Sequence, residues 1–292
     1  MSAIFLEGKP VADAVLSDVA SRVEVLLTQG ITPGLGTILV GEDPASAGYV
    51  RKKHEACAQV GMASSEALLS SSATTDEVIE AVKSFNSDPK VHAFIVQLPL
   101  PAAVDEARVL EAVDPDKDAD GLHPTNLGRL VIGAQGPLPC TPAGIQALLA
   151  HYEVPVAGRH VVIVGRGVTL GRPLALLLAM KRPNANAAVT VVHTGVPNWI
   201  EHTQRADIVI GAAGSPNLIQ PHMVRAGATV IGGGITWQGK RLVSDVDESV
   251  AEVAGWITPR LGGVGPTTVA MLLSNTVAAA ESSAIALGIA RG

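Results

Sequence analysis

The sequence predicts an α/β protein of two lobes. Short apolar runs with strand character alternate with helical patterns, as they do in α/β folds. A polar stretch at residues 114–142 separates two such series. Apolar residues make up 47% of the 292 residues and charged residues 16%, a balance that suits a packed core and excludes a mainly disordered chain. We therefore expect an N-terminal α/β lobe, a Rossmann-like second lobe with a mostly parallel sheet, and a cleft between them.

The first series contains the elements of a small sheet with its helices. A helix is expected at residues 9–29, ended by Gly30 and Pro33. The next elements are expected at 36–40 (strand), 45–60 (helix), 64–69 (strand), 74–86 (helix) and 91–96 (strand). Pro99 and Pro101 cannot donate to a sheet ladder, so they end the last of these strands.

The second series follows a helix at 143–151 that links the lobes. Its elements are expected at 160–164 (strand), 171–181 (helix), 188–192 (strand), 198–205 (helix), 207–210 and 229–231 (strands) and 256–258 (extended). A long apolar helix from about Pro266 closes the chain and is expected to pack on the first lobe. We predict a domain at 1–141, completed by helix 268–292, and a second domain at 142–267.

Composition excludes several classes of function. A net charge of −6 argues against nucleic acid as a partner, because phosphate binding needs clustered Lys and Arg. Glycines and a proline interrupt the uncharged stretch 261–280, so no membrane partner is expected. The N-terminus has no secretory pattern. Cys57 and Cys140 form no disulfide framework and no metal spacing, which favours structural thiols in the reduced cytoplasm and no metal site.

A glycine-rich turn is the strongest single motif. The apolar strand at 161–164 leads into Gly165-Arg166-Gly167-Val168-Thr169-Leu170-Gly171-Arg172-Pro173. A strand, a glycine turn and a helix start form a dinucleotide cradle, in which free N–H groups face the pyrophosphate. The third glycine comes one position later than in G-x-G-x-x-G, so the motif is a variant, and a simple turn is the alternative.

The strand after the turn favours NADP over NAD. NAD enzymes of this type place an acid near its end to hold the ribose 2′-hydroxyl. Here the strand continues into His193-Thr194-Gly195 without an acid. Arg166 could instead bind a 2′-phosphate, and Thr194 could add a hydroxyl. A solvated Arg166 is the competing interpretation.

Two further groups are candidates for chemistry. Tyr49 and Lys53 are spaced i, i+4 on a helix, so an aromatic ring and an amine share one face. This pair suits a flat ligand and proton transfer, although a solvated basic run is the simpler interpretation. Asp118, Asp120 and His123 lie in the polar stretch, where such residues cap turns more often than they bind metals.

Taken together, the motifs resemble one family over about residues 4–277. They occur in its order as Tyr49-Val50-Arg51-Lys52-Lys53, Val96-Gln97-Leu98-Pro99-Leu100-Pro101, Pro115-Asp116-Lys117-Asp118-Ala119-Asp120-Gly121, Pro139-Cys140-Thr141-Pro142, the Gly165–Pro173 turn and Gly262-Gly263-Val264-Gly265-Pro266. The sequence closely resembles the bifunctional methylenetetrahydrofolate dehydrogenase/methenyltetrahydrofolate cyclohydrolase family.

The resemblance implies a homodimeric cytoplasmic enzyme of one-carbon metabolism that acts on tetrahydrofolate derivatives. NADP would accept a hydride from 5,10-methylenetetrahydrofolate, and the methenyl product would be hydrolysed to 10-formyltetrahydrofolate. Lys53 would be the main catalytic group, Gln97 would bond near it, Tyr49 would stack on the aminobenzoyl ring, and Asp120 would bind the pterin. The further folate contacts would be Pro99, Gly262, Gly263 and Pro266, and the cofactor contacts would be Gly165, Arg166, Gly167, Thr169, Gly171, His193, Thr194 and Ile235.

Three departures from the family pattern leave alternatives open. The family often has Ile-Asp-Val-Gly-Ile where this chain has Ile231-Gly232-Gly233-Gly234-Ile235, and it has Pro where Leu261 stands. A His-Ser-basic-Thr pattern is reduced to His193-Thr194-Gly195. The alternatives are a cyclohydrolase with weak or absent dehydrogenase activity and a non-catalytic folate- or dinucleotide-binding protein.

Overall fold

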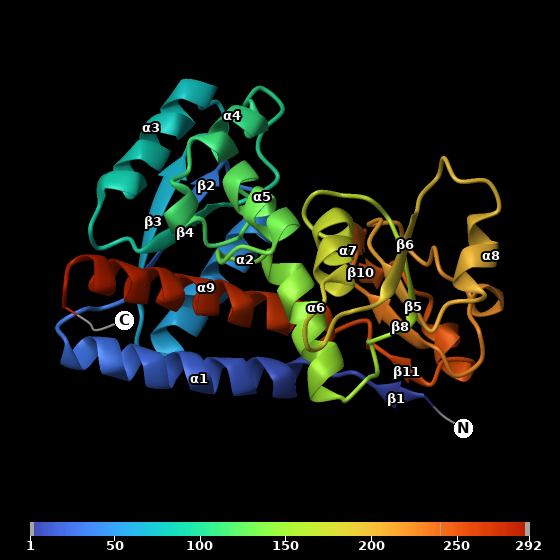
Figure 1. Cartoon of the computed structure of the whole chain (residues 1–292). Coiled ribbons are helices and arrows are strands. Elements are labelled where there is room, and N and C mark those ends of the chain that lie inside the picture. The colour runs from blue at the N-terminus through green and yellow to red at the C-terminus, as the bar shows by residue number, and fades with distance from the viewer. Residues whose placement is uncertain (1–2, 240, 290–292) are drawn as a thin grey trace. The chain divides into compact units, whose positions relative to one another are not determined.

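The computed structural model describes residues 3–239 and 241–289 and divides into two compact units (Figure 1). Unit 1 comprises residues 3–12 and 139–268, and unit 2 comprises residues 13–138 and 269–289. Residues 1–2, 240 and 290–292, which include the ends of the predicted segments 1–141 and 268–292, lie outside the described residues.

Unit 2 is built on a three-stranded parallel sheet in the order β3-β2-β4. The strands are β2 (Gly34–Val40), β3 (Ala63–Leu69) and β4 (Ala93–Val96), and the helices are α1 (Gly8–Thr28, from residue 13), α2 (Pro44–Gln59), α3 (Thr75–Ser87), α4 (Glu106–Glu111), α5 (Pro124–Ile132) and α9 (Val264–Ala286, from residue 269). All seven residues of β2 are buried, as expected for the central strand of a covered parallel sheet.

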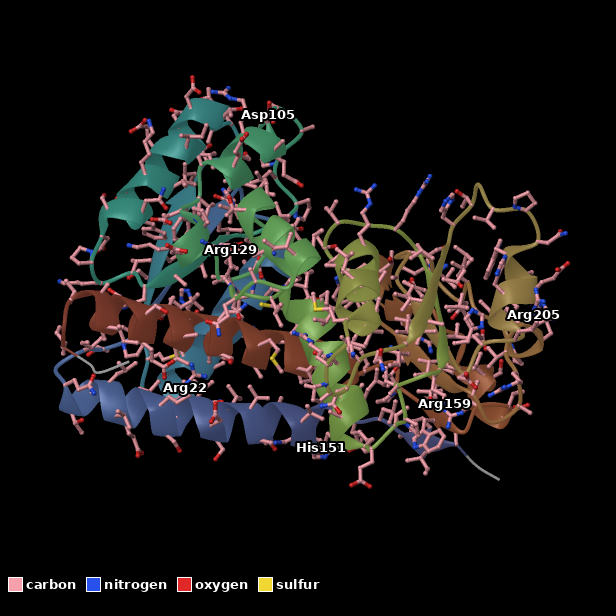
Figure 2. The ribbon with its side chains drawn as sticks, in the orientation of Figure 1. Arg22, Asp105, Arg129, His151, Arg159 and Arg205 are labelled. Carbon is pink, nitrogen blue, oxygen red and sulfur yellow. The ribbon has the colours of Figure 1, made fainter. Side chains whose placement is uncertain are left out.

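Two devices hold the helices of unit 2 in place. Helix α3 opens with a capping box between Thr74 and Glu77, and its Phe85 packs edge-to-face on Phe94 of β4 at 5.5 Å between ring centroids. The Arg22 side chain extends from α1 toward α9, where it donates to both carboxylate oxygens of Glu281 at 2.8 and 2.6 Å (Figure 2). The aromatic contact thus packs α3 against the core of the unit, and a bidentate ion pair joins α1 and α9, the two longest helices of the unit.

The polar stretch at 114–142, predicted as loop, is partly helical, and this corrects the sequence-based expectation. Helix α5 occupies Pro124–Ile132, and α6 begins at Cys140 rather than at 143. His123 caps α5 by accepting the Thr125 N–H, and Pro124 takes the first turn, where its missing N–H costs nothing. A nine-residue helix buries only Asn126 and Leu130, too few apolar positions to show a helical period.

Unit 1 contains a six-stranded sheet in the order β1-β11-β8-β7-β5-β6, with every pair parallel. The strands are β1 (Ile4–Phe5), β5 (His160–Val164), β6 (Ala188–Val192), β7 (Ile208–Gly211), β8 (Thr229–Gly232) and β11 (Trp256–Ile257), and the helices are α6 (Cys140–His151), α7 (Gly171–Ala179) and α8 (Trp199–Thr203). The chain leaves β5 for β6 on one side and returns to β7 on the other. This reversal is the position at which such sheets bind ligands, beyond the carboxyl ends of the strands.

Alternation along β5 divides the core of unit 1 into two layers. Val161 and Ile163 face a cluster that includes Leu148 of α6 and Leu174 of α7. Val162 and Val164 face the other cluster, which includes Val209 and Val230. Because successive side chains in a strand point to opposite faces, this buried run covers both sides of the sheet.

The sequence did not predict an antiparallel hairpin in unit 1. Its strands are β9 (Ile235–Gln238) and β10 (Arg241–Ser244). Ile235 lies opposite Ser244 at one end of the pair, and Gln238 lies opposite Arg241 at the other. The hairpin has only four residues in each strand, and β9 is largely exposed, so it has no apolar run. Its importance lies at its base, where β10 delivers Ser244 and the following Asp245 into the unit.

Helix α9 is the one helix in the described part of the chain that is long and apolar enough to cross a membrane, with a mean hydropathy of 1.3 over its best window. Its Leu272, Leu273, Val277 and Ala280 are almost completely buried inside the protein. Gly265 and Pro266 lie in the first turn, where proline is tolerated, and do not break the helix. These features are typical of the core helix of a globular protein.

The two cysteines are expected to be unreactive in the folded protein. Cys57 is fully buried, and burial raises the pKa of its thiol to about 12, while Cys140 is 4% exposed. Because the thiolate is the reactive form, a colorimetric thiol reagent at pH 8 should detect no fast thiol before denaturation and two afterwards. A thiol that reacts rapidly in the native protein would contradict this assignment.

Candidate active site and dinucleotide site

The amine of Lys53 in unit 2 is held by an oriented amide. Helix α2 starts at the cap Asp43, whose carboxylate accepts the Ser46 N–H at 2.8 Å. Lys53 Nζ donates to Gln97 Oε1 at 2.9 Å, and Gln97 Nε2 donates to the carbonyl oxygen of Leu98 at 2.7 Å. The second bond fixes which end of the amide faces the lysine. The helix and the end of β4 thus place a half-buried cation next to a directed acceptor.

Asp120 belongs to the same group. Burial raises the pKa of the Asp120 carboxyl, the charge of Lys53 opposes that rise, and the charge of Asp118 adds to it. Asp118 is buried and accepts the N–H groups of Gly121 at 3.0 Å and His123 at 2.8 Å, so it shapes the turn that presents Asp120. No metal-holding cluster of His, Cys, Asp or Glu occurs among the described residues.

The surroundings of this group suit a flat polar ligand. Tyr49 lies one helical turn before Lys53 and is 36% exposed, so its ring is available for stacking. Pro99 follows a cis Leu98–Pro99 peptide bond and is exposed. Unit 2 therefore offers an aromatic face, a lysine that can transfer or share a proton, and a carboxyl that can bind polar ring atoms.

The glycine turn of unit 1 is closed so tightly that two of its glycines cannot be replaced. Gly165 has φ +129°, and a Cβ there would overlap the Ala212 carbonyl. A Cβ on Gly171, the first residue of α7, would overlap the Gly165 carbonyl. Gly167 has open space at its Cβ position, and like Thr169 it is exposed. Gly165 and Gly171 thus shape the turn, whereas Gly167 leaves room for a ligand at the start of the helix.

Arg166 and His193 come together at the edge of this turn. Arg166 Nη1 lies 3.2 Å from His193 Nε2, and His193 Nδ1 accepts the Gly195 N–H at 3.1 Å. Thr194 is exposed beside them, and residues 193–195 contain no acid. A guanidinium, an imidazole and a hydroxyl at the ends of β5 and β6 fit the 2′-phosphate of NADP, where NAD would need a carboxylate.

A loop and a carboxylate that were not predicted from the sequence lie at the same edge of the sheet as the glycine turn. Residues 212–217, here called the 212–217 loop, follow β7, and Asp245 accepts three successive N–H groups from it. The small and turn-forming residues of Ala212-Ala213-Gly214-Ser215-Pro216 after a buried strand were a signal for this loop. No pattern signalled Asp245, which is 30 residues further along the chain.

Residues 232–234 make room for two side chains from the hairpin. A Cβ on Gly232 would overlap Ser244 Oγ, and a Cβ on Gly234 would overlap the Asp245 carboxylate. The Gly232 N–H donates to Thr258 Oγ1 at 2.8 Å, and Ser244 Oγ accepts the Val246 N–H at 3.2 Å. In this chain, Ser244 therefore occupies the space into which a side chain at position 232 would extend.

Gly232→Ala is expected to lower the free energy of unfolding by about 1–3 kcal/mol through overpacking against Ser244. Adding Ser244→Ala removes the overlapping oxygen, so the double variant should be more stable than Gly232→Ala alone. Chemical denaturation of the two single variants and the double variant measures this coupling. Equal stability of the double variant and Gly232→Ala would show that Ser244 is not the obstacle.

The remaining predicted positions also lie in unit 1. Gly262 has φ +78°, and its carbonyl accepts the Gly8 N–H at 2.7 Å. Gly263 packs against Thr258, Pro266 lies in the first turn of α9, and Ile235 is 41% exposed at the start of β9. The structure thus groups Tyr49, Lys53, Gln97, Pro99 and Asp120 in unit 2 and all predicted cofactor residues in unit 1.

Two family models match the chain. The catalytic domain of tetrahydrofolate dehydrogenase/cyclohydrolase matches residues 6–120, and the NAD(P)-binding domain of the same family matches residues 139–284. Among curated proteins, the Bifunctional protein FolD of Syntrophotalea carbinolica is 61% identical over 284 residues, which cover 97% of this chain and 98% of that protein. The sequence likeness therefore extends through both units.

Solved structures agree with these matches. The bifunctional enzyme FolD, a methylenetetrahydrofolate dehydrogenase/cyclohydrolase from Campylobacter jejuni, is similar with a TM-score of 0.92 at 38% identity and covers 97% of this chain and 100% of its own. The Trypanosoma brucei methylenetetrahydrofolate dehydrogenase-cyclohydrolase, complexed with NADP cofactor and inhibitor, has a TM-score of 0.91 at 37% identity, with 97% and 99% covered. The chain therefore belongs to the tetrahydrofolate dehydrogenase/cyclohydrolase family.

Proposed function

We propose that this protein oxidises 5,10-methylenetetrahydrofolate to 5,10-methenyltetrahydrofolate with NADP and then hydrolyses the product to 10-formyltetrahydrofolate. The observation that carries the proposal is the Lys53–Gln97 bond of 2.9 Å beside Asp120, in a chain whose other unit has an NADP-type turn. Family membership supports both halves of the reaction.

In the hydrolytic half, a water oxygen adds to the cationic carbon that bridges N5 and N10. As the bond from this carbon to N5 breaks, N5 takes the proton of the added hydroxyl, the carbonyl forms and the formyl group stays on N10. The other proton of the water is lost when the water adds to the carbon. Lys53 Nζ is the titratable group that we assign to this proton transfer and to polarisation of the water. Gln97 Oε1 accepts from Nζ and so orients the amine, while Gln97 itself is held by the Leu98 carbonyl.

The other residues of unit 2 bind and align the substrate. Tyr49 offers a stacking face for the aminobenzoyl ring, and Asp120 accepts hydrogen bonds from the pterin. Pro99 contributes to the folate-binding loop. In unit 1, Gly262, Gly263 and Pro266 are the further positions that we assign to folate and nicotinamide binding, and the two glycines permit close backbone approach.

In the redox half, the chain supplies binding and alignment. NADP, when bound, provides the hydride acceptor. The turn at Gly165, Gly167 and Gly171 receives the pyrophosphate at the start of α7, with Thr169 beside it. Arg166, His193 and Thr194 hold the 2′-phosphate, and Ile235 offers an apolar contact. Hydride transfer needs alignment more than an acid or base, so none is assigned to this step.

A cyclohydrolase with weak dehydrogenase activity is the second candidate. It is favoured by Gly232, which replaces the acid common in the family and whose side-chain space is filled by Ser244. The Lys53–Gln97 pair speaks against the third candidate, a protein that binds folate or a dinucleotide without catalysis.

Two assays separate the candidates. Purified protein is given 5,10-methylenetetrahydrofolate with NADP or NAD, and decay of supplied methenyltetrahydrofolate is followed in parallel. Oxidation that is much faster with NADP, together with rapid decay, is the expected result. Decay without oxidation would favour the cyclohydrolase, loss of both activities would favour a binding protein, and equal rates with NAD and NADP would refute the role of Arg166.

We also propose that the protein is a homodimer of the cytoplasm. Its folate-binding catalytic domain comprises residues 1–141 and 268–292, and its NADP-binding domain comprises residues 142–267. Strand β3 is an edge of its sheet and exposes 65% of Leu68, a surface that a second copy could cover. Two buried cysteine thiols suit a reducing compartment. Light scattering at working concentration should give twice the chain mass, and a monomer mass would contradict the dimer.

A further inference from the structure

Asp245 is a buried carboxylate whose ligands are all backbone N–H groups of one loop. The residue is 1% exposed. Its Oδ2 accepts from Ala213 at 2.8 Å and Gly214 at 3.2 Å, and its Oδ1 accepts from Ser215 at 2.6 Å. Among the described residues it makes no ion pair. Burial raises the pKa of Asp245, and the three N–H bonds oppose that rise. A buried charge with no cation is costly unless such donors compensate it, so this is a built feature of the unit.

The loop that Asp245 holds is packed against the dinucleotide turn. The carbonyl of Ala212 lies where a Cβ on Gly165 would be, so loop and turn touch through backbone atoms. The N–H groups of Gly233 and Gly234 both donate to the carbonyl of Gly211, at 2.9 and 3.0 Å. The ends of β5, β7 and β8 are thereby fixed to one another at the carboxyl edge of the sheet, where the fold binds ligands.

The loop is also bonded to the hairpin, and the glycines of residues 232–234 accommodate this arrangement. Thr236 Oγ1 donates to the Gly214 carbonyl at 2.6 Å, and the Asn217 N–H donates to the Ser244 carbonyl at 2.9 Å. Only a glycine at position 234 leaves space for the Asp245 carboxylate. Ala213 and Gly214 remain exposed while their N–H groups point inward to Asp245.

We propose that Asp245 is a positioning residue for the cofactor, which sets the backbone of the 212–217 loop so that its exposed face and the Gly165 turn form one rigid floor for NADP. The inference rests on the proposed NADP-dependent function. Asp245 acts through the loop and touches no reacting atom. With the loop held in advance, binding does not have to order it, and this lowers the cost of cofactor association. The residues assigned to hydrolysis, Lys53, Gln97 and Asp120, belong to the other unit, so we expect the hydrolytic half to change little when Asp245 is replaced.

Asp245→Asn tests the proposal with little change in shape. An amide turns one acceptor oxygen into a donor that faces an N–H group, so the loop loses at least one bond. We expect the KM and the Kd for NADP to rise by at least about tenfold, the scale for a lost bond to a buried charge. The kcat at saturating NADP should change much less, and decay of methenyltetrahydrofolate without NADP should stay within about twofold of the parent. Asp247→Asn is the matched control, because Asp247 accepts the Ser249 N–H and should leave NADP binding unchanged.

Thr236→Val provides a second, milder variant in case Asp245→Asn fails to fold. It removes the bond to the Gly214 carbonyl without changing the size of the side chain, and a smaller rise in Kd for NADP is expected. Normal NADP affinity in a folded Asp245→Asn protein, or in Thr236→Val, would overturn the proposal. Equal loss of both activities at unchanged KM for NADP would also overturn it, since that indicates a general structural role. Titration calorimetry with NADP keeps the result separate from the proposed function, which fails instead if the parent protein shows no oxidation.

Discussion

Lys53→Met is expected to slow decay of methenyltetrahydrofolate by about 10²–10⁴-fold, the contribution typical of a positioned proton-transfer group. Methionine keeps the length of the side chain and removes the amine, so the bond to Gln97 Oε1 is lost while the packing of α2 is largely kept. The proposed NADP site lies in the other unit and should bind its cofactor normally. Single-substrate decay assays and NADP titration measure the two effects separately.

Lys52→Met is the matched control for this prediction. Lys52 is the neighbouring residue on the same helix, carries the same charge and is exposed, whereas Lys53 is half-buried against Gln97. The control should lose little activity. If Lys52→Met and Lys53→Met had equal rates, the basic run would act only through its overall charge, and Lys53 would have no role in the mechanism.

Gly165→Ala is expected to have the second largest effect, on both stability and NADP binding. Gly165 has φ +129°, which L-residues rarely adopt, and a Cβ would overlap the Ala212 carbonyl. Strain of about 1–3 kcal/mol is expected from the backbone alone, and the overlap adds to it. The thermal unfolding temperature should fall, and the Kd for NADP should rise as the turn and the 212–217 loop move apart.

Gly167→Ala separates ligand approach from backbone strain. Its Cβ position is open, so the variant should unfold at the parental temperature. If dinucleotide phosphates approach this part of the turn, the added methyl group should still weaken NADP binding. A parental temperature with Gly165→Ala, or a large loss of stability with Gly167→Ala, would contradict the different roles assigned to the two glycines.

Sequence patterns predicted the parts of the fold that depend on residues close together in the chain. The runs at 160–164 and 188–192 are rich in β-branched apolar residues and are bounded by turn residues, and they form β5 and β6 with those bounds. The comparisons confirm the two-lobed α/β class and the family that the motifs indicated. Lys53 and Gln97 were named from the motifs, and the structure adds their direct bond.

The features that escaped prediction depend on contacts between distant residues. Helix α5 carries too few buried positions to show a period, and β9 and β10 are short strands that depend on each other. Asp245 and the loop it holds are separated by 30 residues. The departure at Gly232 was visible, but its physical reason, the Ser244 side chain, appears only once the hairpin is folded.

One chain is expected to carry both halves of the reaction, and an assay that follows both products in one mixture tests this claim. Purified protein receives 5,10-methylenetetrahydrofolate and NADP, and NADPH and 10-formyltetrahydrofolate are quantified over time. We predict that the two products reach equal amounts, with methenyltetrahydrofolate present only transiently. NADPH formed without 10-formyltetrahydrofolate, or no NADPH at all, would contradict the claim.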